Sequence, residues 1–348
     1  MTTFIQLHIL TAYPPANLNR DDTGKPKTAQ FGGAERLRVS SQALKRAWRT
    51  SAEFKQALDG HIGERTQRLG DEIEQHLKTK GIDEAKAREI ARAIADRFGK
   101  PKPEKDPNPA RIEQLAFISP EERADAFALA ERSAAGESVD IEKSALLRKT
   151  DAAVDIAMFG RMLADDPEFN RDAAVQVAHA ITTHRTVVED DYYTAVDDLK
   201  GPAEDAGAGF VGEAGFGSGV FYIYVCIDRD LLVRNLGGEA VLADRGIAAL
   251  IRAAATVSPR GKQASYASRA RASYVLAERG KAAPRTLAAG FLKPVRGDDI
   301  LVESVNALEK QRGSFAAAYG DEPAYAVMSV AEGRGTLQDI IAFATVRG

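Results

Sequence analysis

The chain has 348 residues, of which 44% are hydrophobic and 28% charged, and its formal net charge is −3 at pH 7. This composition is typical of a globular protein with a substantial core. It excludes a surface coated in positive charge, so a polyanion would have to bind at local patches. The single cysteine, Cys226, excludes an intramolecular disulfide and a multi-cysteine zinc site.

The sequence contains no segment that predicts membrane contact. No secretory leader precedes the first predicted strand, and the most apolar run, "GVFYIYVCI" from Gly219, stops at Asp228. That run is far shorter than the ~20 residues that a helix needs to cross a bilayer. We therefore expect a cytoplasmic protein with no membrane partner.

The N-terminal part predicts a strand, a loop and a helix. Apolar residues alternate in "TFIQLHILTAYPP", residues 3–15, which indicates a strand. The polar, glycine-containing stretch 16–33 predicts a surface loop. "VSSQALKRAWRTSAEFKQAL", residues 39–58, has apolar residues at helical spacing and begins with Ser40 and Ser41 as candidate N-caps, so we expect one amphipathic helix.

The rest of the chain predicts a mixed architecture. Residues 63–149 are rich in alanine and charged residues and indicate a helical insertion, interrupted by four prolines within residues 100–110. Two β-rich runs around a glycine-rich stretch predict a long hairpin that leads into a central strand at 219–228. Helices and strands then alternate to the C-terminus, so the fold class is α+β with an antiparallel sheet.

Residues 31–49 set five cations against one acid, Glu35. The cations are Arg36, Arg38, Lys45, Arg46 and Arg49. Gln42 and the last three cations fall at i, i+3, i+4 and i+7 of the predicted helix, so they form one row that can follow spaced phosphates. A basic helix face is more often plain solvated surface, but the nearby Arg20, Lys25 and Lys27 favour a polyanion site.

Two further motifs do not point to a cofactor or to zinc. "GAGFVG", residues 207–212, matches the dinucleotide-binding pattern but leads into a strand rather than a helix, so it fits a hairpin tip with Val211 as its apolar residue. His179 and His184 are five residues apart, which does not align them on a helix, and buried or surface histidines are favoured.

An acidic pair leaves one alternative open. Asp21 and Asp22 are suitable Mg²⁺ ligands, but no third carboxylate stands nearby in a matching motif, so we favour loop ordering or partner contact. We predict no catalytic residue, no metal and no cofactor.

Three apolar residues fit either core packing or contact with bases. Tyr192 and Tyr193 are adjacent on a predicted strand and must face opposite ways, so one is available to stack on a base. Met162, in "FGRML", fits a core gap or a wedge between bases.

Six blocks together carry a family resemblance. They are "NLNRDD" from Asn17, "FGG" from Phe31, "RVSSQALKRAWR" from Arg38, "AHAITTH" from Ala178, "TAVDDL" from Thr194 and "SGVFYIY" from Ser218. In this order and spacing the sequence resembles the CasC-type backbone subunit of the type I-E CRISPR Cascade complex. The likeness covers nearly the whole chain, although residues 64–149 match only in length and in general composition.

The resemblance implies a hand-shaped fold: an RRM-like (ferredoxin-like) palm, a helical fingers insertion and a β-hairpin thumb. The implied parts are residues 1–58 and 219–348 for the palm, 59–155 for the fingers, 156–186 for the return to the palm and 187–218 for the thumb.

The resemblance also implies a function. Copies of the chain would assemble head to tail along a CRISPR RNA (crRNA), together with other Cascade subunits, and present the guide to target DNA without catalysis. Two alternatives stay open: a metal-dependent ribonuclease with Asp22 as the candidate residue, and a general binder of single-stranded RNA. The implied RNA-binding residues are Asn19, Arg20, Lys27, Arg38, Ser40, Gln42, Lys45, Arg46, Arg49, Met162, Tyr192, Tyr193 and Val211.

Overall fold

A computed structural model describes residues 2–141, 144–150, 152–163, 166–195 and 210–345. The strands are β1 (Phe4–Ala16), β2 (Thr28–Phe31), β3 (Ala34–Val39), β4 (Glu64–Thr66), β5 (Ala116–Ile118), β6 (Val175–Val177), β7 (Ala180–Thr182), β8 (Glu189–Ala195), β9 (Phe210–Asp228), β10 (Tyr274–Gly280) and β11 (Ala324–Ser329). The α-helices are α1 (Ser41–Arg49), α2 (Ala52–Ala57), α3 (Leu69–Thr79), α4 (Glu84–Asp96), α5 (Pro120–Ala134), α6 (Val154–Phe159), α7 (Arg229–Asn235), α8 (Ala240–Thr256), α9 (Gln263–Tyr266), α10 (Ile300–Tyr319) and α11 (Leu337–Thr345), with short 3-10 helices at Pro167–Phe169 and Ala288–Phe291. This mixture of helices and antiparallel strands confirms the predicted α+β class.

The main sheet has the strand order β11-β10-β1-β9-β7-β3-β2, and β6 and β8 also pair with β9. The central pair β1 and β9 is antiparallel, with Leu7 opposite Val225. One face carries Ile5, Leu7 and Phe221 and packs against α1 and α8. The other face carries Leu10 and Tyr222 and packs against α10. Both faces of β1 and β9 are therefore buried, which explains why apolar and aromatic residues occupy both alternating sets.

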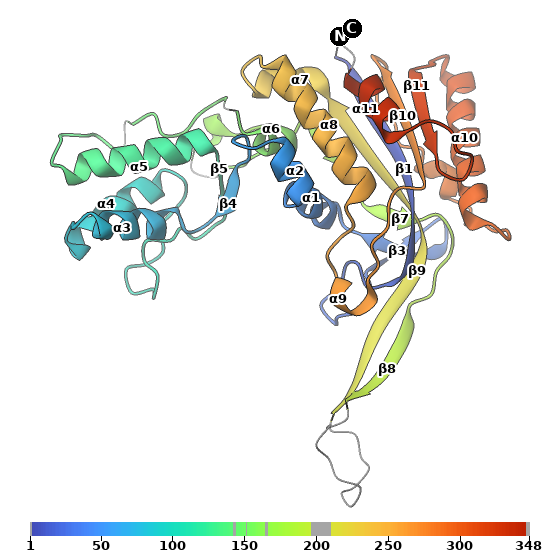
Figure 1. The fold of residues 1–348 in the computed structure, drawn as a ribbon, viewed down its shortest axis with the longest axis horizontal. Coiled ribbons are helices and arrows are strands. Elements are labelled where there is room, and N and C mark those ends of the chain that lie inside the picture. Colours follow the sequence, from blue (N-terminus) through green and yellow to red (C-terminus); the bar gives the residue numbers. More distant parts are fainter. Residues whose placement is uncertain (1, 142–143, 151, 164–165, 196–209, 346–348) are drawn as a thin grey trace, which may run out of the picture.

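A helical unit of α3, α4, α5 and the β4–β5 pair has a hydrophobic core of its own and lies beside the sheet (Figure 1). The buried Arg161 fastens it to the rest of the molecule. Its guanidinium donates to Glu122 at 2.6 Å and to the carbonyls of Phe117 and Arg148. Because a buried charge is stable only when it is paired and hydrogen-bonded, these bonds fix the helical unit to the segment that returns to the sheet.

The strands β8 and β9 form a hairpin that projects from the sheet (Figure 1). Its register runs from Glu189 opposite Phe216 to Ala195 opposite Phe210, and every residue of β8 is exposed. The predicted long hairpin is thus present, while its tip, at residues 196–209, lies outside the described part.

Two local predictions were wrong. The predicted loop 16–33 contains β2, which pairs with β3 through a turn at Gly32 and Gly33, where φ is +60° and +72°. Such a turn needs residues that accept positive φ, and two glycines meet that need. The predicted single helix 39–58 is two helices, because the Ser51 hydroxyl caps α2 by accepting from the Phe54 amide.

No helix in the described residues is both long enough and apolar enough to span a membrane.

Candidate nucleic-acid interface

An open groove of about 750 Å³ runs between α1, the helical unit and the segment after α6. Its lining residues are Gln42, Lys45, Arg46, Arg49, Arg65, Leu115, Phe117, Phe159, Gly160, Arg161, Met162, Arg171, Asp172 and Ala173. The groove thus brings together the predicted row on α1 and the predicted wedge Met162, which is 113 residues or more from that row in the chain.

The helix α1 presents its basic row as predicted. Ser40 is the N-cap, and its hydroxyl accepts from the Ala43 amide at 3.3 Å. Leu44 and Trp48 are buried on the opposite side. Gln42 and Arg46 are exposed. The cap fixes the start of the helix, and the buried side fixes its rotation, so the row must face the groove.

Lys45 is half-buried, whereas Gln42 and Arg46 on the same row are exposed. Its ammonium lies 5.6 Å from the centre of the Phe159 ring, and burial lowers its pKa below the ordinary value. A bound anion would stabilise the charged form of such a partly desolvated ammonium.

Arg49 makes contacts within the protein as well as facing the groove. Its guanidinium forms an ion pair with Asp155 at 3.3 Å and lies 4.9 Å from the centre of the Phe117 ring. Asp155 also accepts from the Gly63 amide at 2.7 Å. These contacts tie α1 to the entry into the helical unit and to α6, so Arg49 holds the groove walls in position.

Asp155 gives a pH-dependent prediction. Burial is the main reason that its pKa is raised to about 6, against the opposing effect of the Gly63 amide and Arg49. The folded state therefore holds this proton more tightly than the unfolded state, and the group costs stability as pH rises from about 4 to about 6. We expect Asp155→Asn to remove about 3 kcal/mol of that decline, as measured by urea denaturation of both proteins from pH 4 to pH 7. Equal slopes for the two proteins would contradict this expectation.

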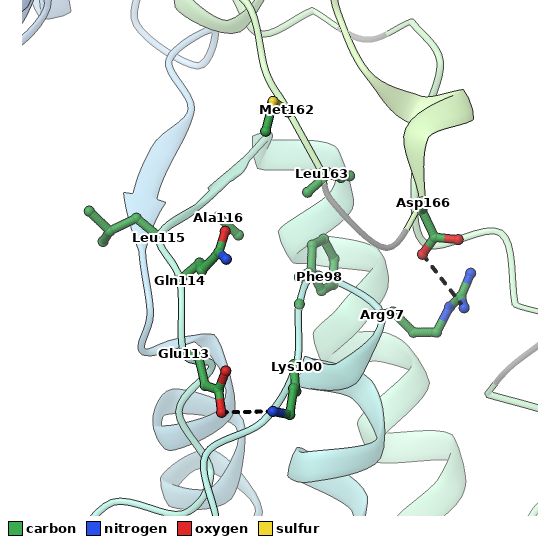
Figure 2. A pocket seen from close by; sticks show the side chains of 11 residues that line it. Arg97, Phe98, Lys100, Glu113, Gln114, Leu115, Ala116, Met162, Leu163 and Asp166 are labelled. Carbon is green, nitrogen blue, oxygen red and sulfur yellow. Dashed lines mark ion pairs between the residues drawn. The ribbon is translucent and has the colours of Figure 1, made fainter.

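Leu115 and Met162 line both the groove and a smaller pocket of about 130 Å³ in the helical unit (Figure 2). They are two apolar residues at the border between the groove and this pocket. Met162 is 80% exposed and Leu115 is 52% exposed. Two exposed apolar side chains beside a cationic groove suit contact with unstacked bases. Met162 is thus no core residue. Leu115 was missed because its segment carries no periodic or motif signal.

Three cations that line the groove differ in their partners from the cations on the helices of the helical unit. On the helices α3, α4 and α5, Lys78, Arg88 and Arg123 each form ion pairs with glutamates. Lys45, Arg46 and Arg65, the last a residue that sequence reasoning missed, form no ion pair with any residue that the structure describes. Their charge remains available to an external anion.

A second cluster of predicted residues lies at the N-terminal end of α1. The Asn19 side-chain oxygen accepts from the Ser40 amide at 2.9 Å, and its carbonyl accepts from the Lys27 amide at 2.8 Å. Arg38 donates to His179 Nδ1 at 3.1 Å. Burial, followed by the positive charge of Arg38 and Lys27, lowers the pKa of His179. The cluster therefore has a positive potential of its own, and the exposed Arg20 adds to it.

Arg36 does not belong to the basic surface. Its side chain is fully buried and donates to the carbonyls of Thr182 and Phe291 at 3.0 and 2.7 Å. Its inclusion among the available cations was wrong. A buried guanidinium can instead use its N–H groups to join a strand to a neighbouring loop by hydrogen bonds.

The aromatic pair lies on the projecting hairpin. Tyr192 is 68% exposed and Tyr193 is 43% exposed. Both side chains are therefore exposed in this chain, whereas the sequence predicted that one of the two would be available to a base. The backbone of Val211, in β9, pairs with Thr194 of β8, and the Val211 side chain lies outside the described part. The structure does not bring these three residues into the groove of the same chain.

Asp21, the first residue of the acidic pair, orders its own loop. An Asp21 oxygen accepts from the Thr23 amide, the Thr23 hydroxyl and the Lys25 amide. The Thr23 hydroxyl is the main reason that the pKa of Asp21 is lowered. In the part of the chain that the structure describes, no three His, Cys, Asp or Glu side chains lie close enough to hold a metal ion.

Fold and groove together define an α+β protein with an open cationic cleft, an arrangement that can hold a polyanionic strand. The chain belongs to the CT1975-like protein family, whose model matches residues 5–343. Its fold matches a chain of a solved structure described as "CRISPR RNA-guided surveillance complex, pre-nicking", with a TM-score of 0.85 and 30% identity over 98% of this chain and 99% of the other. A chain described as "CRISPR RNA-guided surveillance complex" matches with a TM-score of 0.62 and 25% identity, over the same shares. The comparison with curated proteins finds no significant match.

These matches confirm the resemblance to CRISPR surveillance-complex proteins, and the type I-E subtype stays a prediction.

Proposed function

We propose that this protein is the crRNA-binding backbone subunit of a type I-E CRISPR Cascade complex. The observation that carries the proposal is the groove itself. Lys45, Arg46 and Arg65, which form no ion pair with a described residue, line it beside the exposed side chains of Leu115 and Met162. The fold of the chain matches a protein of an RNA-guided surveillance complex. Phosphate oxygens are the ligands that such cations favour.

The arrangement suits a strand of any sequence. Gln42, Lys45 and Arg46 follow one another along α1 and can contact successive phosphates, which position a strand without reading it. Met162 and Leu115 offer apolar contact, which any base can use. Specificity would then come from base pairing between the guide and target DNA, without catalysis by this subunit.

Assembly is the second part of the proposal. The sheet with its helices would be the palm, the helical unit the fingers, and the β8–β9 hairpin the thumb. The hairpin extends away from the groove of its own chain, so Tyr192, Tyr193 and Val211 would contact the guide held by the next copy. Head-to-tail copies, together with other Cascade subunits, would then cover the guide.

The test is a titration of fluorescent single-stranded RNAs of several lengths and unrelated sequences at two salt concentrations, with nuclease-treated protein. We expect binding that is insensitive to sequence, steeply dependent on salt and saturating in proportion to RNA length. Binding confined to one sequence, or independent of length, would contradict the proposal.

The same preparations test the ribonuclease alternative. We expect no cleavage of RNA complementary to the guide when Mg²⁺ is added. Cleavage by the wild type that Asp22→Ala abolishes would establish the ribonuclease and overturn the scaffold role.

A further inference from the structure

The stretch between Asp244 and Glu278 is basic throughout. Its 33 residues contain six cations and no acid, in a chain whose total charge is −3. The cations are Arg245, Arg252, Arg260, Lys262, Arg269 and Arg271. Four of them fall in residues 258–271, which we call the basic loop.

The basic loop packs against the candidate interface. The Arg260 guanidinium donates to the Thr50 carbonyl at 3.1 Å, at the C-terminal end of α1. Gly261 lies so close to the backbone at Asn17 and Leu18 that a Cβ there would come within 2.4 Å of their carbonyl oxygens. Only a glycine permits this approach. The loop is therefore held between the end of α1 and the start of the "NLNRDD" segment, and Figure 1 shows α9 close to the base of the projecting hairpin.

The charges of the basic loop are available to a ligand. Arg260, Arg269 and Arg271 are exposed. Neither they nor Lys262 form an ion pair with any residue in the described ranges. They share this property with Lys45 and Arg46 and differ in it from the paired cations of the helical unit.

Two residues of the basic loop have a strained backbone conformation. Lys262 and Ala267 have φ values of 49° and 48°, and they are the non-glycine residues of the described chain in the left-handed region. This conformation costs roughly 1–2 kcal/mol per residue and persists where surrounding contacts enforce it. Here the Gln263 amide group donates to the Pro259 carbonyl at 2.9 Å and helps to hold the loop.

The basic loop also borders a cavity of about 560 Å³ with Arg260, Gln263 and Arg269 in its lining, together with one acid, Glu53. The side-chain oxygen of Gln263 is buried and accepts no hydrogen bond from the described residues. A ribose 2′-hydroxyl is a donor that such an oxygen can accept from.

We propose that the basic loop is a second contact surface for single-stranded RNA, adjoining the groove along the side of α1. Arg269 and Arg271 would bind phosphates next to those held by Lys45 and Arg46, and Gln263 would accept from a ribose. This inference rests on the proposed RNA binding and adds to it a site outside the groove.

The test compares two double variants of equal charge. Arg269→Glu/Arg271→Glu removes two exposed cations whose side chains make no hydrogen bond or ion pair within the described chain. The control, Lys281→Glu/Lys310→Glu, removes two exposed cations, of which Lys310 lies on α10 across the sheet from α1. We expect the first variant to lose about tenfold in RNA affinity and to reduce the salt slope by about 1.4, as two phosphate contacts on a single strand require. The control should keep the wild-type affinity and slope.

Three results would overturn the inference. If Lys45→Glu/Arg46→Glu weakens RNA binding and the basic-loop variant does not, the groove binds RNA and the basic loop does not. If the basic-loop variant binds short RNA normally but no longer fills long RNA, the loop contacts a second copy of the chain. If the control loses as much affinity as the basic-loop variant, the effect is one of total charge. Absence of RNA binding by the wild type would instead refute the proposed function.

Discussion

Reversal of two groove cations, in Lys45→Glu/Arg46→Glu, is expected to weaken binding of single-stranded RNA by about a hundredfold and to lower the salt slope by about 1.4. Both side chains face the groove and neither has an ionic partner among the described residues, so each is free to contact a phosphate. The loss should be equal for RNAs of unrelated sequence, because phosphate contacts carry no sequence information.

The choice of these two positions follows from the structure. Arg49 is left unchanged because its pairing with Asp155 supports the fold, and its loss would confuse binding with stability. Anisotropy titrations at two or more salt concentrations measure the effect, with Lys281→Glu/Lys310→Glu as the variant of matched charge. An unchanged salt slope in Lys45→Glu/Arg46→Glu, with a normal unfolding curve, would mean that the RNA-binding surface lies on another face of the protein.

The second large effect concerns the buried carboxylate of Glu278. We expect Glu278→Gln to destabilise the protein by about 3–5 kcal/mol at pH 7, because it removes the charge that compensates two arginines. Arg285 and Arg312 donate to the two oxygens of Glu278 at 2.5 and 3.0 Å, and His8 lies 3.2 Å away. Burial lowers the pKa of His8, so the ring is neutral and donates its Nε2 proton to the carboxylate.

The pKa of Glu278 predicts that the protein loses stability in acid. Burial would raise its pKa, but the hydrogen bonds from His8 and Arg285 outweigh burial and lower the pKa to about 2. The stability that Glu278 contributes is therefore complete above its ordinary pKa of 4.5 and is lost as the pH falls from there toward 2.

Urea denaturation from pH 3 to pH 7 measures both effects of Glu278. The difference between wild type and Glu278→Gln should shrink steadily below pH 4.5, while the exposed control Asp298→Asn follows the wild type throughout. A difference that does not change with pH would show that the loss arises from packing rather than from charge.

The sequence predicted those parts of the site that depend on local periodicity. The helical spacing of Leu44 and Trp48 determines which side of α1 is buried and therefore which side carries the basic row. The strand predicted at 219–228 is part of β9, where alternation places Phe221 and Tyr222 on opposite faces of the sheet. Ser40 was recognisable as a cap because its residue type and position suffice for that role.

The remaining features depend on contacts between distant parts of the chain. Arg36 and Arg38 stand two residues apart in the same basic stretch, yet one is buried against Phe291 and the other reaches His179. Arg65 and Leu115 reach the groove only because Arg161 and Asp155 fix the helical unit beside α1. No periodic pattern records such pairings, since they join segments tens to hundreds of residues apart.

The most direct test of the backbone role is the mass of the particle that forms on a guide. The protein would be co-expressed with its Cascade partners and with guide RNAs of two lengths, and native mass spectrometry would count its copies in each particle. We predict that the copy number rises in proportion to guide length, since each copy holds a fixed stretch of strand. A copy number that stays the same on the longer guide would contradict the account.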